Sequence, residues 1–109
     1  LRQTQADLLL KQNQPAAAEK VISQLLASRP QDPDIWYLAA EVRGLSGDIV
    51  GVHQARAEYF ALVGNYDQAI EQLDFAKRRA SGNFQLAARM DARQRDLKEE
   101  KKMIEEMLR

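Results

Sequence analysis

Two similar helix-ending signals stand 17 residues apart in this sequence, at Gly47-Asp48 and at Gly64-Asn65. In each signal a glycine ends one helix and the following Asp or Asn can cap the next. Since globular helices average about 10–14 residues, this interval corresponds to one helix and one short turn. The spacing therefore predicts a row of short helices that pack as successive hairpins.

Helix breakers and apolar periodicity predict six helices and no strand. The Gln-, Ala- and Leu-rich composition also favours helix over sheet. We expect Asp32, Asp48 and Asn65 to act as N-caps. The expected helices cover roughly Arg2 to Gln12, Pro15 to Ser28, Pro33 to Leu45, Asp48 to Val63, Tyr66 to just before Ser81, and the 25 or so residues that follow Ser81-Gly82-Asn83.

The sequence lacks the residues that several classes of function require. The 16 basic residues balance 16 acidic ones, so we expect no nucleic-acid binding. The longest apolar run, around Ile35 to Ala40, is too short to span a bilayer, so we expect no insertion into a membrane. Without cysteine and with His53 as the single histidine, the chain cannot assemble a zinc site of its own, and we expect no cofactor. The scattered glycines form no phosphate-binding loop. We therefore expect no catalytic residue and no enzymatic activity.

The sequence resembles the tetratricopeptide repeat, a helix–turn–helix unit of about 34 residues. Ala18, Ile22 and Pro30 match its second helix and closing proline, and Trp36 matches its first-helix tryptophan. A further copy of the turn and second helix comprises Gly64, Tyr66, Ala69, Leu73 and Ala76. The resemblance predicts an all-α fold of antiparallel hairpins stacked as a short solenoid, with residues 1–82 forming the repeats and residues 83–109 a charged capping helix.

The repeat phase slips once. Ala18 and Ala69 occupy equivalent positions but lie one and a half repeats apart. The helix expected from Asp48 to Val63 must therefore serve both as the second helix of one repeat and as the first helix of the next. It fits both roles poorly, because Val52 stands where a small Ala belongs and His53 where the Trp belongs.

The repeat pattern also predicts the core. Small residues let helix axes approach, and large residues fill the remaining space. The expected small residues are Ala18, Ala40, Ala57 and Ala69, and the expected large ones are Trp36, Tyr59, Phe60, Leu73 and Phe75.

Two stretches carry a narrower resemblance, "LLASRPQDPDIWYLAAEV" and "ARAEYFALVGNYDQAIEQLDFAKRRA". They are similar to the C-terminal repeat domain of bacterial periplasmic zinc metalloproteases of the beta-barrel assembly-enhancing type. The resemblance implies a periplasmic module that docks a protease onto outer-membrane protein assembly machinery and its substrates. It also implies a protease domain upstream, holding the zinc, from which no catalytic residue carries over to this chain.

In this family the first helix of each repeat lines a concave groove for a partner protein. Carried onto this sequence, the groove positions are Gln3, Asp7, Leu10 and Lys11, then Asp34, Tyr37, Glu41 and Leu45, and, if the fourth helix acts as a first helix, Gln54, Glu58 and Leu62. Tyr37 is the strongest candidate, because its neighbour Trp36 is expected to face the core. So short a groove predicts micromolar affinity.

The last helix allows two interpretations. Its thin apolar stripe is interrupted by Arg93, and "RQRDLKEEKKMIEEMLR" is mostly charged. We expect it to cap the array as a polar-faced end helix and the chain to be monomeric. The alternative is a structural or oligomerisation segment without a groove, in which this helix pairs between chains.

Overall fold

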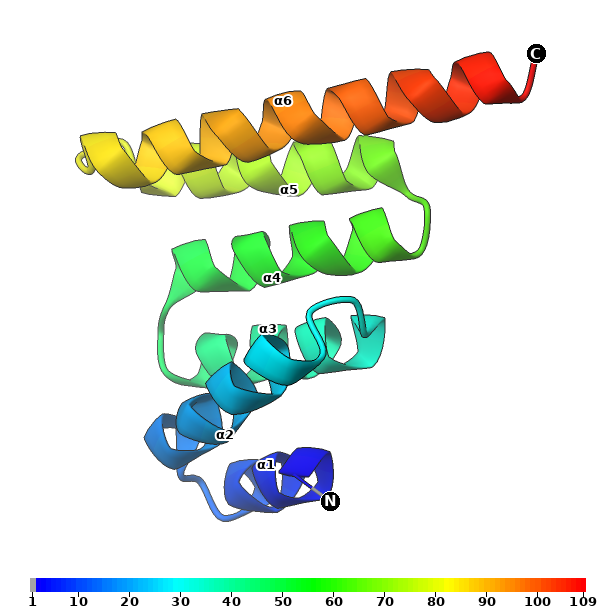
Figure 1. Cartoon of the computed structure of the whole chain (residues 1–109). Coiled ribbons are helices and arrows are strands. Elements are labelled where there is room, and N and C mark those ends of the chain that lie inside the picture. The colour runs from blue at the N-terminus through cyan, green and yellow to red at the C-terminus, as the bar shows by residue number, and fades with distance from the viewer. Residues whose placement is uncertain (1) are drawn as a thin grey trace.

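The computed structural model describes residues 2–109, without the side chains of Arg2, Gln3 and Leu10. Within this range it contains six helices and no strand, which confirms the predicted all-α fold (Figure 1). The helices are α1 (Arg2–Lys11), α2 (Pro15–Ser28), α3 (Pro33–Leu45), α4 (Ile49–Leu62), α5 (Tyr66–Arg79) and α6 (Phe84–Met107).

The helix-ending signals act as predicted, with one exception. Gly47 and Gly64 adopt φ of 81° and 86°, a left-handed conformation that glycine reaches without strain. The Asp32 and Asp48 side chains accept hydrogen bonds from backbone N–H groups of the helices that follow them. Asn65 occupies the N-cap position of α5 as predicted, but its side chain forms no capping hydrogen bond.

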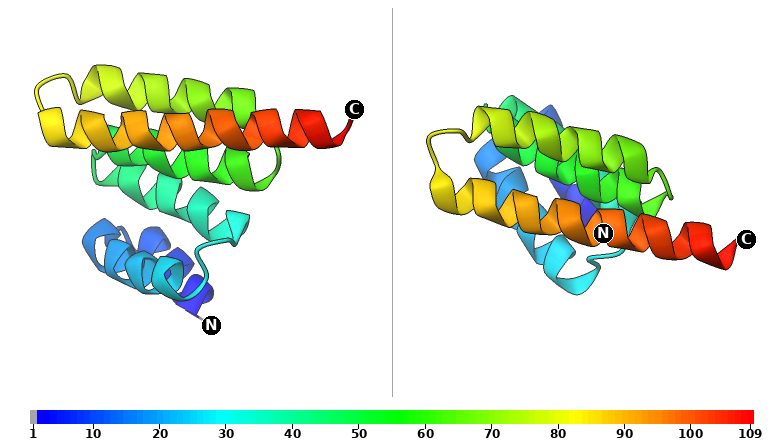
Figure 2. Two further views of the ribbon diagram at one scale, coloured as in Figure 1. Left: turned by 45° about the horizontal axis from the view of Figure 1, so that its top comes forward. Right: turned by 90° about the horizontal axis from the view of Figure 1, so that it is seen from above.

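Successive helices pack side by side, and α4 makes the most extensive contacts with its neighbours among the described helices (Figures 1 and 2). Its contacts with α3 and with α5 are the two most extensive between described helices. The buried side chains form two clusters that meet at α4. Val52 and Ala55 of α4 complete a first core with α1, α2 and α3, while Ala57 belongs to a second core with α5 and α6.

The small core residues are where the repeat pattern placed them, but most of the large ones are not. Ala18, Ala40, Ala57 and Ala69 are buried, as is Leu73. The aromatic residues expected in the core are only partly buried, namely Trp36, Tyr59, Phe60 and Phe75. The Trp36 indole N–H donates a 2.8 Å hydrogen bond to the Pro30 carbonyl near the surface. Small and aliphatic side chains therefore fill the core and leave the aromatic rings at its margins.

Polar contacts fix α6 along α5. Gln94 is buried, and its amide donates to the Ile70 carbonyl at 3.0 Å and to the Asp74 carboxylate at 2.8 Å. Lys77 binds Asp91 at 2.8 Å near one end of the contact. A buried amide with two acceptors sets the register of the two helices, because any slip would leave it unpaired. The predicted domain boundary after residue 82 falls in the turn before α6 and stays a prediction.

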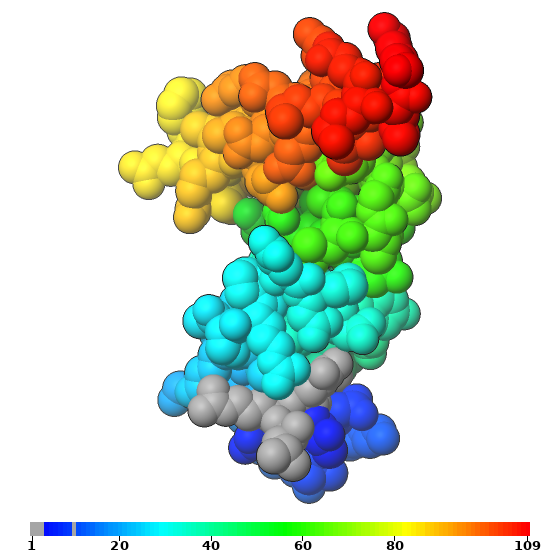
Figure 3. All heavy atoms as spheres, turned by 45° about the vertical axis from the view of Figure 1, so that its right-hand side comes forward, coloured from blue at the N-terminus to red at the C-terminus, as the bar shows by residue number. Residues whose placement is uncertain are grey.

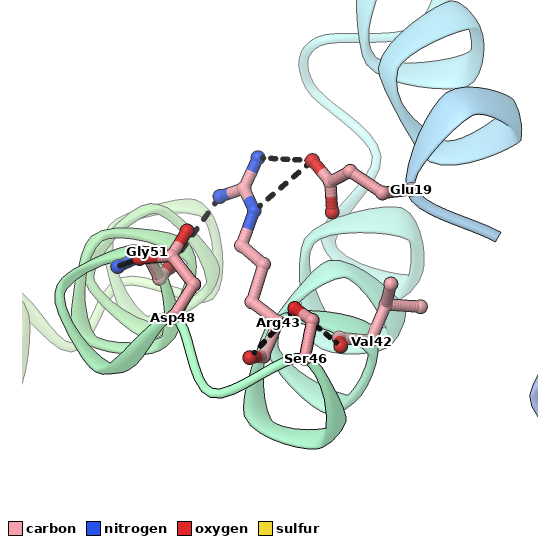
Figure 4. A network of polar contacts seen from close by, with 6 residues as sticks. All are labelled: Glu19, Val42, Arg43, Ser46, Asp48 and Gly51. Atoms are coloured by element: carbon pink, nitrogen blue, oxygen red, sulfur yellow. Dashed lines mark hydrogen bonds and ion pairs between the residues drawn. The ribbon is translucent and has the colours of Figure 1, made fainter. Parts of the chain in front are cut away.

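Arg43 of α3 links α2 to α4 (Figure 4). Its guanidinium donates to the Glu19 carboxylate of α2 and to the Gly51 carbonyl of α4, each at 3.4 Å. Asp48 caps α4 by accepting from the Gly51 N–H at 3.0 Å. Two interactions therefore stabilise the α3–α4 turn. Arg43 binds the Gly51 carbonyl, and the Asp48 carboxylate caps the N-terminus of α4.

Replacing Gly51 with Ala tests this turn. A Cβ there would lie 2.9 Å from the Arg43 Cδ and closer still to the Asp48 carboxylate. Loss of the cap outweighs the gain in helix propensity, so we expect Gly51→Ala to lower the free energy of unfolding by about 1 kcal/mol. Urea denaturation measures it. Gly82→Ala, which meets open space, is the control and should be neutral or slightly stabilising; equal effects would contradict the assignment.

The Lys77–Asp91 pair gives a pH-dependent prediction. The hydrogen bond from Lys77 lowers the pKa of Asp91 below its ordinary value of 3.8. Because the folded pKa is the lower one, the pair's contribution is complete above about pH 4 and is lost as the pH falls through the folded value. In an NMR titration of the carboxyl carbons, Lys77→Gln should raise the pKa of Asp91 back towards 3.8. An unchanged value would show that the pair does not form in solution.

Candidate functional site

An open apolar cavity lies between α3 and α4. Its volume is about 460 Å³, and its walls are Tyr37, Ala40, Glu41, Gly44, Leu45, Val52, Arg56, Tyr59 and Phe60. We call this cavity the α3–α4 groove. The two helices run antiparallel. Residues spaced one turn apart on α3 therefore lie opposite residues spaced one turn apart on α4. Three residues predicted for partner binding, Tyr37, Glu41 and Leu45, thus lie on one wall.

Aromatic rings form one end of the groove. The Tyr37 and Tyr59 rings meet edge to face with centroids 5.6 Å apart, and the Tyr59 ring meets Phe60 in the same way at 5.5 Å. Tyr37 nevertheless keeps 57% of its surface exposed, and Leu45 at the other end keeps 61%. Exposed apolar surface held in a fixed arrangement is typical of a binding surface, since ordering these rings costs little on binding.

Two opposite charges line the groove, one on each wall. Glu41 extends from α3 and Arg56 from α4, and both line the cavity. Neither forms an ion pair with another described side chain at 4.0 Å or less. A partner with an apolar side chain flanked by charged groups would find complementary charges on both walls.

The structure does not bring Gln54 and Glu58 into the α3–α4 groove. Both lie on the opposite side of α4, in a second pocket of about 270 Å³ that also includes Trp36, Arg43, Leu73, Arg89, Met90 and Arg93. Figure 3 shows the surface recessed between the segment around residue 30 and α6. The fourth helix thus presents one side to the groove and the other to α5 and α6, which the repeat phase alone did not reveal.

The Glu58 carboxylate is already engaged within the chain. Arg93 of α6 donates two hydrogen bonds to it, each 2.8 Å long. These bonds raise the pKa of Arg93 above its ordinary value. Arg93, which interrupts the apolar stripe of the last helix, therefore attaches α6 to α4.

The other predicted residues lie apart from the groove. Leu62 is exposed at the end of α4. Asp7 and Lys11 form an exposed ion pair of 3.8 Å along α1, and Asp34 is exposed at the start of α3. The side chains of Gln3 and Leu10 lie outside the described residues. Partner binding by these residues stays a prediction.

Sequence reasoning missed the α4 wall of the groove. Tyr59 and Phe60 were expected in the core and Arg56 was given no role, yet all three line the cavity. Val52, Arg56 and Tyr59 are spaced as one face of a helix. The antiparallel pairing of this face with Tyr37, Glu41 and Leu45 is the signal that would have identified it.

The described residues show neither a metal site nor a membrane span. Within residues 2–109, no three His, Cys, Asp or Glu side chains come together as metal ligands would. His53 is partly buried, with its Nδ1 2.8 Å from the Gln72 side-chain oxygen. No helix in this range combines the length and the apolar character needed to cross a bilayer.

Comparison with known proteins agrees with the helical stack. The tetratricopeptide repeat family matches residues 1–42, which contain α1, α2 and most of α3. Residues 1–42 therefore belong to the tetratricopeptide-repeat family. A beta-barrel assembly-enhancing protease of Yersinia pestis is 36% identical over 88 residues, which is 81% of this chain and 18% of that protein. The chain therefore spans less than a fifth of that relative. Tetratricopeptide repeats mediate protein–protein interactions, so the groove is the natural candidate for a binding surface.

Replacing Glu58 with Gln separates its structural role from a binding role. The Glu58 and Arg93 side chains are mostly buried, at 22% and 33% exposure. We expect Glu58→Gln to lower the free energy of unfolding by about 1–2 kcal/mol, because Arg93 loses its closer carboxylate partner and keeps only Glu100, at 3.6 Å. Asp7→Asn, in an exposed pair, is the control and should cost under about 0.5 kcal/mol. Urea denaturation compares them; equal effects would show that the Glu58–Arg93 pair does not stabilise the fold.

Proposed function

We propose that the α3–α4 groove binds a segment of a partner protein. The observation that carries this proposal is the exposed Tyr37 ring, held against Tyr59 in an open apolar cavity. A peptide can enter such a groove as an amphipathic helix or as an extended segment with one large apolar side chain. Since only two helices form the walls, binding is weak, with a dissociation constant on the order of micromolar.

We further propose that this interaction docks a periplasmic metalloprotease, of which this chain is a part, onto the outer-membrane protein assembly machinery and its substrates. The support is the 36% identity to a protease that is named for enhancing β-barrel assembly. On this proposal the zinc and the catalytic residues belong to another domain of the parent protein. The repeat domain binds the partner protein, and the protease domain catalyses the hydrolysis.

Site-specific photo-crosslinking tests the partner. A crosslinking residue at position 37 or 56 lies in the groove, and one at position 71, exposed on α5, lies outside it. In cell envelopes containing the full-length parent protein, the groove positions should form adducts that mass spectrometry identifies as a β-barrel assembly component or an unassembled barrel protein. Equal adducts from position 71, or adducts lacking such proteins, would contradict the proposal.

Truncating Tyr37 tests the groove itself. We expect Tyr37→Ala to weaken binding of the crosslinked partner about tenfold, as loss of an exposed aromatic anchor does. Helicity and the denaturation midpoint should change little, because Tyr37 is mostly exposed. Isothermal titration and circular dichroism measure the two effects, with Glu71→Ala as the control. Unfolding of Tyr37→Ala would show instead that this ring belongs to the fold.

A further inference from the structure

The end of α6 and its C-cap residue carry four large apolar side chains that the rest of the described chain leaves uncovered. They are Met103, Ile104, Met107 and Leu108, with exposed fractions of 61%, 41%, 81% and 83%. Lys101 binds Asp67 near the start of α5, and the turns after it project past α5 (Figures 1 and 2). We call these four side chains the terminal stripe.

The terminal stripe differs from scattered surface apolar residues. Its members are spaced i, i+1, i+4 and i+5, which places them along one side of a helix. The earlier part of α6 buries Met90 and Leu97 against α5. The same helix therefore has one segment whose apolar face is covered and a second segment whose apolar face is open to solvent.

The α3–α4 groove matches the terminal stripe in size. The stripe covers six residues, with a rise of about 7.5 Å, and the groove wall from Tyr37 to Leu45 extends about 12 Å, at about 1.5 Å per residue. The groove volume of about 460 Å³ has room for two or three of these side chains. Two of the four are methionines, which adapt their shape to irregular apolar surfaces.

The charges beside the two surfaces are also complementary. Lys101 and Glu105 stand one turn apart on one edge of the terminal stripe, 3.6 Å from each other. The groove carries Glu41 on one wall and Arg56 on the other. Lys101 is held by Asp67 of its own α5 at 2.6 Å, so Glu105 is the charge on this edge that the groove can receive, and Arg56 on the α4 wall is the opposite charge that would meet it.

We propose that the α3–α4 groove of one chain binds the terminal stripe of a second copy. A contact of this size lies at or below the lower limit of stable interfaces, about 1,200 Å² in total, so self-association is weak and concentration-dependent. The same groove is then closed to other proteins in the associated form. This regulatory consequence rests on the proposed function; the self-association itself does not.

Mixing two variants tests the pairing of groove with stripe. Tyr37→Asp places a charge in the groove and leaves the stripe intact, and Met107→Asp does the reverse. Sedimentation equilibrium follows the mean mass from about 10 to about 500 micromolar, the range expected for so small an interface. We expect the unmodified chain to gain mass with concentration, each variant alone to stay monomeric, and their equimolar mixture to form a heterodimer.

The other outcomes overturn the proposal in distinct ways. If Tyr37→Asp still self-associates and Met107→Asp does not, two stripes pair with each other. The reverse result means that two grooves pair. A monomeric unmodified chain over the whole range excludes self-association, and crosslinking from position 37 would then still test the proposed partner independently.

Phe84 supplies the matched control. It is as exposed as the stripe residues, at 88%, and lies at the opposite end of α6. Phe84→Asp should leave the mass profile unchanged, and loss of association in this variant would indicate non-specific apolar contact. Circular dichroism of all three variants checks that each retains its helicity.

Discussion

The packing of α4 between α3 and α5 is the constraint on which the rest of the structure depends. A helix with neighbours on two sides needs small residues on both, and Ala55 and Ala57 meet this need for the first and second core respectively. Because α4 completes both cores, three helices before it and two after it form one continuous body. Among the described helices, α4 makes the main attachment of α5 and α6 to the first three helices.

The half-repeat slip explains why the chain has a groove on one side of the α3–α4 hairpin and a pocket on the other. In a regular array a second helix turns its Ala and Phe positions inward. Here those positions are Val52 and Arg56, and both line the α3–α4 groove. The opposite side of α4 carries Glu58, whose carboxylate accepts a hydrogen bond from Arg93 of α6. The irregular helix thus separates a surface that binds within the chain from a surface that is open.

Most of the fold followed from local signals, whereas half of the candidate site did not. Proline, glycine and capping residues define each helix boundary through backbone geometry, which depends on few neighbours. The α3 wall of the groove followed from the repeat pattern as well. The α4 wall depends on which side of a doubly packed helix faces solvent, and α4 hides that choice because its polar and apolar residues are distributed around the whole helix. Likewise, the sequence showed Arg93 only as an interruption of the apolar stripe of the last helix. Its hydrogen-bond acceptor, Glu58, lies 35 residues away and could not be paired with it from the sequence.

The groove bridges the two cores, and this has a consequence for local unfolding. Val52 on its α4 wall belongs to the first core, and Phe60 on the same wall packs against the second. A ligand seated between them makes contacts that opening of either cooperative unit would break. Amide protons far from the bound segment, in α2 and in α6 alike, would then exchange more slowly. Binding at the α3–α4 groove would in this way slow amide hydrogen exchange on both sides of α4.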